Sequence, residues 1–202
     1  MTILPPSPPS PDGFAALIRW VDGELAAGRP VTLGDALNQA GARMHGAAIL
    51  LLALPESIPL PIPSFGAILG VPLIIISAHL ALFGEDGELP ERARAIVLPQ
   101  QMIAVMVRYL LRPLQRAERM TQDRMPALAR RERLVGMVCL AMSLLLLLPL
   151  PFMNVPPALA LVCMSWGLAQ RDGVFVGLGL AVAAVFIATL LALADLVWGA
   201  IA

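Results

Sequence analysis

The sequence predicts an all-α membrane protein, on three observations. Of its 202 residues, 58% are apolar and 14% are charged, and the mean hydropathy is +0.81. A soluble domain usually carries about 25% charged residues. The apolar residues form segments that prolines interrupt in a repeated way, and all fourteen basic residues are arginine. We therefore expect two proline-broken helical hairpins as an internal repeat, one closing transmembrane helix, and amphipathic interfacial helices.

The two predicted membrane hairpins are residues 46–83 and 134–169, and each has apolar residues on both sides of a proline cluster. Proline cannot continue a helix, because it lacks the N–H group and clashes with the preceding turn. Irregular backbone inside a membrane must be buried in protein or face water. Each cluster is therefore either a turn at the far membrane surface or the tip of a re-entrant hairpin. The structural prolines at these clusters are Pro59 and Pro61 in the first hairpin and Pro149 and Pro151 in the second.

Both hairpins also end alike, at the polar sequences Gly84-Glu85-Asp86-Gly87 and Arg171-Asp172-Gly173. Together with the matching proline clusters, this likeness predicts an internal repeat with an offset of about ninety residues, a duplication common in transporters. The alternative is that any two membrane hairpins look alike.

The arginines predict how the chain is oriented. Ten of the fourteen lie between Arg92 and Arg133. Because cytoplasmic loops carry an excess of basic residues, residues 84–133 are expected to be cytoplasmic, with Arg43 and Arg171 anchoring the open ends of the hairpins on the same side. Residues 174–198 are long enough to cross a ~30 Å hydrocarbon core, and they would then cross outward.

The polar segments are expected to be partly helical. Residues 1–13 are rich in proline, do not resemble a signal peptide, and are expected to form a disordered tail. Residues 14–45 should form cytoplasmic amphipathic helices. Within them, Thr32 is a plausible N-cap with Asp35 at the capping-box position.

Another amphipathic helix is expected from Gln101 onward, bent near Pro113. Its apolar stripe includes Ile103, Met106 and Leu114, and its opposite face is basic. This pattern suits the surface of an anionic cytoplasmic leaflet, although a helix that packs on the membrane domain would show the same stripe. The arginines expected to bind anionic lipid headgroups are Arg108, Arg112, Arg116 and Arg119.

Glu56 is the strongest candidate for a substrate or ion site, with Ser57 beside it. It is the only carboxylate in the first hairpin. In a re-entrant hairpin it would lie near mid-membrane, where an ionised group is costly and usually functional, and desolvation would raise its pKa. At a surface turn it would be solvated and unimportant. Asn154 has a comparable position in the second hairpin, where it would face Glu56 across a pseudo-two-fold axis or serve as an ordinary turn residue.

Two further polar positions have both a structural and a functional interpretation. His79 is expected to make a hydrogen bond between helices, with a proton relay as the alternative. Asp172 is expected to cap the last helix, with Arg171 among the lipid headgroups.

Several classes of function are excluded or disfavoured. The sequence has no Gly-rich phosphate loop, no cluster of metal ligands and no nucleophile–His–acid set, so we expect no enzymatic activity, cofactor or metal. Cys139 and Cys163 fall within apolar runs and are expected to be small packing residues. Because the arginine-rich stretch lacks interleaved aromatic residues, we expect lipid rather than nucleic acid as its partner.

An ordered series of motifs resembles the ExoD family. It comprises the Leu-Ala-Leu-Pro and Ile-Pro-Leu-Pro runs between Gly46 and Gly84, then Leu89-Pro90-Glu91-Arg92, the Pro149–Phe152 element with Asn154, and Arg171-Asp172-Gly173. The likeness covers residues 14–195. It implies a multi-pass protein of the bacterial inner membrane that is linked to exopolysaccharide synthesis. His79 and Leu89 depart from the family pattern, where Gln and Trp are common.

Three functions remain as hypotheses. The preferred one is a small transporter or channel with Glu56 and Asn154 near a central site. The second is a scaffold or regulatory subunit that contacts exopolysaccharide machinery, or a second copy of itself, through residues 84–133. The third, an enzyme acting on lipid-linked sugar, would need a second carboxylate or a metal site, and the sequence shows neither.

Overall fold

The computed structural model describes residues 13–40, 44–58, 65–122, 124–148 and 154–201, which are almost entirely helical. The one β-bridge in these ranges joins Thr32 to Val97. The predicted all-α class is therefore confirmed. The elements are α1 (Phe14–Ala26), α2 (Leu33–Ala40), α3 (Met44–Ala53), the 3₁₀ turn η1 (Pro55–Ser57), α4 (Phe65–Phe83), α5 (Glu91–Arg94), α6 (Gln100–Tyr109), α7 (Leu111–Met120), α8 (Pro126–Ala129), α9 (Glu132–Leu146), α10 (Val155–Gln170) and α11 (Gly173–Ile201).

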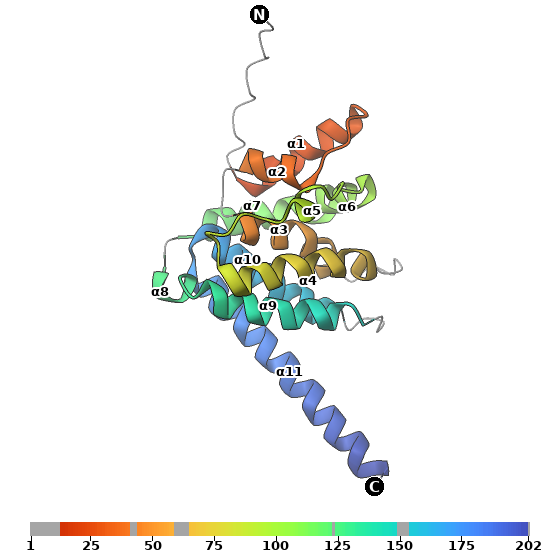
Figure 1. Ribbon diagram of the computed structural model, residues 1–202, viewed down its shortest axis with the longest axis vertical. Coiled ribbons are helices and arrows are strands. Elements are labelled where there is room, and N and C mark those ends of the chain that lie inside the picture. Colours follow the sequence, from red (N-terminus) through yellow and green to blue (C-terminus); the bar gives the residue numbers. More distant parts are fainter. Residues whose placement is uncertain (1–12, 41–43, 59–64, 123, 149–153, 202) are drawn as a thin grey trace, which may run out of the picture.

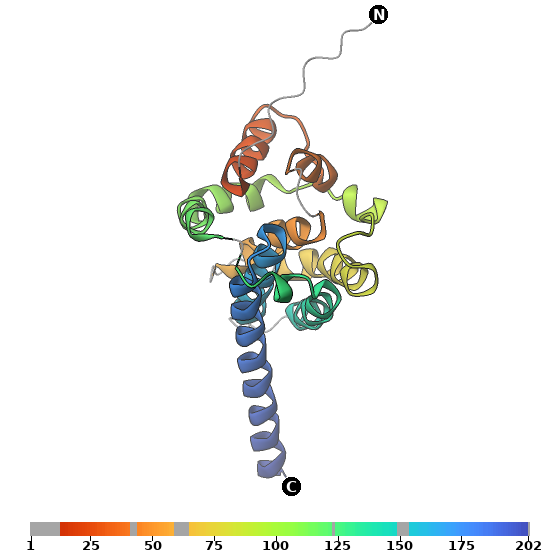
Figure 2. The ribbon, with the colours of Figure 1, turned by 90° about the vertical axis from the view of Figure 1, so that its left-hand side faces the viewer.

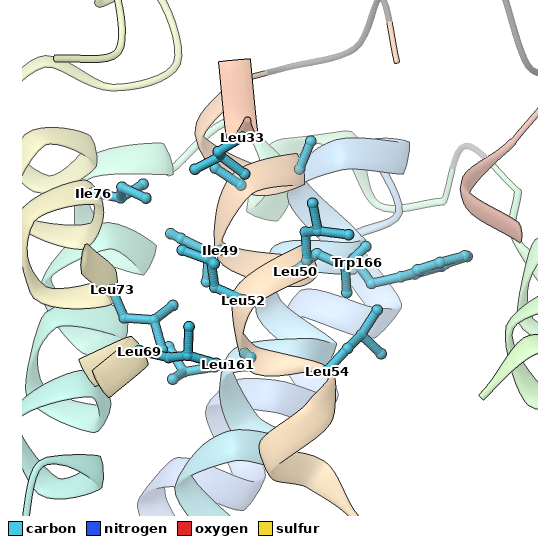
Figure 3. Packing of buried hydrophobic residues seen from close by; sticks show 14 of the residues in the cluster. Leu33, Ile49, Leu50, Leu52, Leu54, Leu69, Leu73, Ile76, Leu161 and Trp166 are labelled. Atoms are coloured by element: carbon cyan, nitrogen blue, oxygen red, sulfur yellow. The ribbon is translucent and has the colours of Figure 1, made fainter. Parts of the chain in front are cut away.

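Helix α3 lies at the centre of the molecule, in contact with α2, α4 and α10. Every residue from His45 to Ala53 is buried, as expected for a helix that is apolar on all sides. In Figure 3, Ile49 of α3 points toward Leu73 of α4, whereas Leu50 points to the other side, toward Trp166 of α10. Helix α3 therefore holds the hairpin helices together around one apolar core.

The hairpin helices interlock across the two halves of the chain. Helix α4 packs mainly on α9, and α10 packs on α3, so the second helix of each hairpin contacts the first helix of the other. At one point the backbones of α4 and α9 come so close that a Cβ atom added to Gly136 would lie 2.5 Å from the amide nitrogen of Ala81. A buried hydrogen bond of 3.3 Å between the hydroxyls of Ser77 and Ser143 also joins these helices. Neither hairpin is a separate module.

A second layer, made of α1, α2, α5, α6 and α7, covers the hairpins at the end opposite the free end of α11 (Figure 1). Helix α1 packs on α6 and α7, and α2 packs on α5. The predicted capping box begins α2. The amide of Asp35 donates to Thr32 Oγ1 at 3.1 Å, and Asp35 Oδ2 accepts from the amide of Thr32 at 2.9 Å.

The basic amphipathic segment is two helices that meet at Leu110, three residues before Pro113, so the expected bend near Pro113 is confirmed. Pro113 lies in the first turn of α7, where a residue without an N–H group loses no helical hydrogen bond. The stripe residues Ile103 and Met106 are fully buried, and both helices pack on α1. The stripe therefore packs on the protein, which is the alternative interpretation of the pattern.

Helix α11 leaves the bundle and continues alone (Figure 2). Its first turns pack closely on α10, where a Cβ atom on Gly179 would lie 2.7 Å from the amide nitrogen of Met164. Among the residues with a defined placement, it is the one helix long and apolar enough to cross a membrane, over Gly173–Gly199. Only 17% of its most apolar window is buried inside the protein, whereas the core helix of a soluble protein would be mostly buried.

Candidate functional site

The side chains of Glu56 and Asn154 interact with each other, although 98 positions separate them in the sequence. Glu56 lies in the turn η1 of the first hairpin, and Asn154 immediately precedes α10 in the second. Both residues are half-buried. The structure thus brings the two principal candidate residues together at the tips of the two hairpins, and we call this pair the tip site.

The prolines beside the tip site explain its local backbone. Pro55 follows α3 and occupies the start of η1, where its fixed φ angle suits the first position of a helical turn. Ser57, the neighbouring candidate, donates its hydroxyl to the carbonyl oxygen of Leu54 at 2.6 Å, which stabilises this turn. Pro156 is in the first turn of α10, two positions after Asn154. These turns hold the Glu56 and Asn154 side chains at fixed helix ends.

The chemistry available at the tip site follows from its partial burial. Glu56 is half-buried, so its carboxyl is partly shielded from water beside the Asn154 side chain. The Asn154 amide offers one donor and one acceptor group. A carboxyl with this partner can exchange a proton or contribute oxygen ligands to a small cation.

A second polar cluster lies at the other end of α3, and we call it the histidine cluster. His45 and His79 contact each other through Nε2 and Nδ1 at 2.8 Å. His79 thus makes the hydrogen bond between helices that the sequence favours. The Glu85 carboxylate accepts hydrogen bonds from the amides of His45 at 3.0 Å and Gly46 at 2.6 Å. Negative charge at a helix N-terminus is stabilising, because the free amides and the helix dipole favour it.

The histidine cluster is tied to α9 as well. Glu132, at the start of α9, accepts a hydrogen bond from the amide of Glu85 at 2.9 Å. Gly84 ends α4 with φ +75°, a left-handed conformation that suits glycine and turns the chain so that Glu85 reaches α3. Sequence reasoning missed His45, Glu85 and Glu132. The available signal was that the chain has only two histidines and that an acidic residue follows Gly84 directly.

Two of the remaining structural candidates, Asp172 and Arg171, lie within the described residues. Asp172 is buried, and its carboxylate accepts hydrogen bonds from the amides of Val174 at 3.0 Å and Gln122 at 3.2 Å. It therefore caps α11 and ties α11 to the loop after α7. Arg171 is exposed and ends α10 with φ +57°. The other candidates, Arg43, Pro59, Pro61, Pro149 and Pro151, lie outside the described residues.

No group of three or more His, Cys, Asp or Glu side chains is placed to hold a metal ion in the part of the chain that the structure describes. Cys139 is buried and Cys163 is half-buried, and both are free thiols. The arginines Arg108, Arg112, Arg116 and Arg119 are exposed on α6 and α7.

Residues 14–192 match the family model described as "Exopolysaccharide synthesis, ExoD". The chain is similar to Protein ExoD of Rhizobium meliloti, with 28% identity over 176 residues that cover 83% of this chain and 73% of the relative. It is also similar to an uncharacterized protein of a Synechocystis strain, with 25% identity over 156 residues that cover 76% of this chain and 74% of the relative. No solved structure shows significant similarity to the chain.

Proposed function

The chain belongs to the ExoD family of exopolysaccharide synthesis, and on that premise we propose that it is a bacterial inner-membrane protein that moves a proton or a small cation through the tip site. The interaction between the Glu56 and Asn154 side chains carries this proposal. It joins a carboxyl and an amide from two hairpins at a place where the backbone is not continuously helical, which is how many transporters build their sites.

Membrane insertion is supported by the distribution of exposed apolar residues. Contiguous apolar surface of this kind marks an interaction with lipid or protein. Such residues cover the free length of α11, including Val185, Leu191 and Trp198. They also lie on the outer surfaces of α4 and α9, whereas the second layer exposes mainly polar groups. The exposed large apolar residues of these two helices are Val71, Ile75, Leu82 and Phe83 in α4 and Leu134, Met137 and Leu144 in α9, with Leu147 and Leu148 directly after α9.

Helix length favours re-entrant hairpins over hairpins that span the bilayer. At 1.5 Å per residue, the 10 residues of α3 extend about 15 Å and the 15 residues of α9 about 22 Å. Both lengths fall short of a ~30 Å hydrocarbon core. The interlocked packing of α4 on α9 and α10 on α3 fits two related halves around one site. Under this proposal the tip site lies inside the membrane and residues 84–133 face the cytoplasm.

The test is proton and cation flux in proteoliposomes, with the wild type compared with Glu56→Gln. Glutamine keeps the size of the side chain and can still bond to Asn154, but it cannot carry a proton or a negative charge. We expect flux in the wild type and its loss in Glu56→Gln. Glu88→Gln is the matched control, because Glu88 is an exposed carboxylate far from the hairpin tips in the sequence. Equal flux in wild type and Glu56→Gln would contradict the proposal.

A scaffold or regulatory role is the second candidate, and the exposed arginine face favours it. Arg112, Arg116 and Arg119 recur at spacings of four and three residues on α7, which places them on one side of the helix. Their apolar counterparts are buried against α1, so these side chains are presented outward to anionic lipid headgroups or to partner proteins of the exopolysaccharide machinery. Loss of exopolysaccharide production in a triple Arg→Gln variant, with no effect of Glu56→Gln, would favour this role.

A further inference from the structure

The histidine cluster contains an unusual contact between two imidazole rings. His45 Nε2 and His79 Nδ1 are 2.8 Å apart, and the ring planes differ by 7°. Two bare nitrogens, or two N–H groups, would repel each other at this distance. One nitrogen must therefore donate a proton and the other must accept it.

His45 Nδ1, the ring nitrogen that does not face His79, is buried and has no hydrogen-bond partner among the described atoms. The nearest carboxylate oxygen, Glu85 Oε2, is 3.6 Å from His45 Nδ1. The His45 side chain is 0% exposed and the Glu85 side chain is 4% exposed, so water does not screen this pair. A buried nitrogen without a partner is costly, whereas a proton on Nδ1 would point toward a negative charge.

The printed contacts of the cluster with neighbouring helices involve acidic and uncharged groups. Glu132 and Cys139 are titratable groups that α9 contributes near Glu85. From α10, the neighbours of Gly46 are Leu168 and Ala169, which are uncharged. From α4, the Phe83 ring packs on His79 with a centroid separation of 4.5 Å. The negative charge of Glu85 therefore opposes the cost of burying a positive charge on the histidine pair. Arg43, which precedes α3, lies outside the described residues.

We propose that His45 and His79 form one proton-binding site. The neutral pair carries two N–H groups, and uptake of one proton from water gives three. One N–H is then shared between His45 Nε2 and His79 Nδ1, one extends from His45 Nδ1 to Glu85 Oε2, and one extends from His79 Nε2 at the half-buried end of the pair. The added positive charge is balanced by the Glu85 carboxylate. A second proton would put two donors face to face at the 2.8 Å contact, so the pair takes up only one readily.

Proton binding at this pair acts on the structure through Glu85. The same carboxylate holds the first amides of α3 and is linked by its own amide to α9. The protonated pair adds a charge-assisted contact between α3 and the segment after α4. The site is at the opposite end of α3 from the tip site, and it is an equilibrium property that needs no transport. A test can therefore support or contradict the proton-binding site independently of the proposed function.

The chain is well suited to a direct test, because His45 and His79 are its only histidines. The full chain is labelled with ¹³C,¹⁵N-histidine in detergent micelles, and the imidazole NMR signals are followed from pH 9 to pH 4. We expect both rings to change together in the first step, with a second step lower by more than about one pH unit. Two independent single steps, one for each ring, would overturn the proposal.

Two variants locate the balancing charge and the shared proton. Glu85→Gln should move the first step about 1 to 3 pH units lower, since an opposite charge at close range shifts a pKa by that amount. Asp86→Asn, at the exposed neighbouring carboxylate, should leave it unchanged. His79→Gln should leave His45 with one step, at least tenfold weaker in proton affinity than the first step of the wild type. A folded Glu85→Gln variant with an unshifted first step would contradict the proposal. If Glu85→Gln does not fold, an unshifted His45 step in His79→Gln would contradict it.

Discussion

Glu118 of α7 caps the first turn of α1, because its Oε1 atom accepts a hydrogen bond of 3.0 Å from the amide of Ala15, 103 positions earlier in the chain. The same oxygen lies 2.6 Å from where a Cβ atom on Gly13 would be, and Gly13 has φ +99°. The left-handed φ angle therefore favours glycine before α1, and a Cβ atom there would also displace the Glu118 carboxylate. This contact joins the start of α1 to α7 within the second layer.

Replacing Glu118 should loosen α1 without disrupting the hairpins. We expect Glu118→Ala to lower the free energy of unfolding by about 1 kcal/mol, the usual effect of losing a side-chain cap at a helix N-terminus. Amide hydrogen exchange at Ala15 should become faster. Glu88→Ala is the control, since Glu88 is exposed. Unchanged exchange at Ala15 would show that the cap does not stabilise α1.

The close approach of α4 and α9 predicts strong sensitivity at Gly136. A Cβ atom there would be 2.5 Å from the backbone nitrogen and 2.8 Å from the Cα atom of Ala81, and backbone cannot move aside as a flexible side chain can. We expect Gly136→Ala to destabilise the protein by about 1–3 kcal/mol through overpacking, measured as thermal unfolding in detergent.

Gly23 provides the matched control for that substitution. It lies within α1, and a Cβ atom there would meet nothing within 4 Å. Alanine in an open helix interior is favoured over glycine by roughly 0.5–1 kcal/mol. Gly23→Ala should therefore raise the unfolding temperature while Gly136→Ala lowers it, and equal effects would refute the packing argument.

The capping box of α2 predicts a pH dependence. The hydrogen bonds from the hydroxyl and amide of Thr32 lower the pKa of Asp35 in the folded state. Stabilisation from a carboxylate with a lowered pKa is complete above the unfolded value of about 4, and it is lost as the pH falls through the folded value. Asp35→Ala should reduce stability by about 1 kcal/mol at pH 7, and its difference from the wild type should shrink below pH 4. A difference that stays constant with pH would contradict this account.

The free part of α11 predicts how the protein is held in a bilayer. Val185 is near the middle of the candidate span Gly173–Gly199 and is 67% exposed, whereas Trp198 is at its end. Arginine at the centre of a transmembrane helix costs about 2.5–3.5 kcal/mol in insertion assays, and much less near the interface. We expect Val185→Arg to reduce insertion of α11 strongly and Trp198→Arg to reduce it little, measured by insertion of the segment into microsomes. Equal insertion of both variants would indicate that α11 contacts protein instead of lipid.

Local sequence signals predicted the local features well. The spacing of Thr32 and Asp35 identified the start of α2, because a capping box depends on residues that lie three apart. The likeness between the two hairpins also placed Glu56 opposite Asn154, a contact that no local rule gives. Pro113 also located the break between α6 and α7 to within three residues, because proline is tolerated in the first turn of a helix but not in its interior.

The histidine cluster could not be predicted in the same way. Its contacts join the start of α3 to residues 34 and 40 positions later in the chain, and they join Glu85 to Glu132, 47 positions further on. They therefore exist only after α4 and α9 have packed. The sequence marks Glu85 as a boundary residue between an apolar segment and a loop, and Glu85 does lie at that boundary. Its carboxylate, however, caps α3 and not α4, the helix that it follows. The sequence indicates that such an acid ends a segment, but tertiary packing decides which helix it caps.

The interlocked packing of the two hairpins has a consequence for biosynthesis. The ribosome releases α3 and α4 long before α9 and α10, which are the surfaces that cover them in the finished protein. During that interval the apolar faces of the first half have no protein partner, and the amide of Glu85 cannot yet donate its hydrogen bond to Glu132. A nascent chain that stops before residue 132 therefore needs another apolar surface to cover these helices. Cutting the gene between the halves should yield two fragments that are stable only when they are produced together.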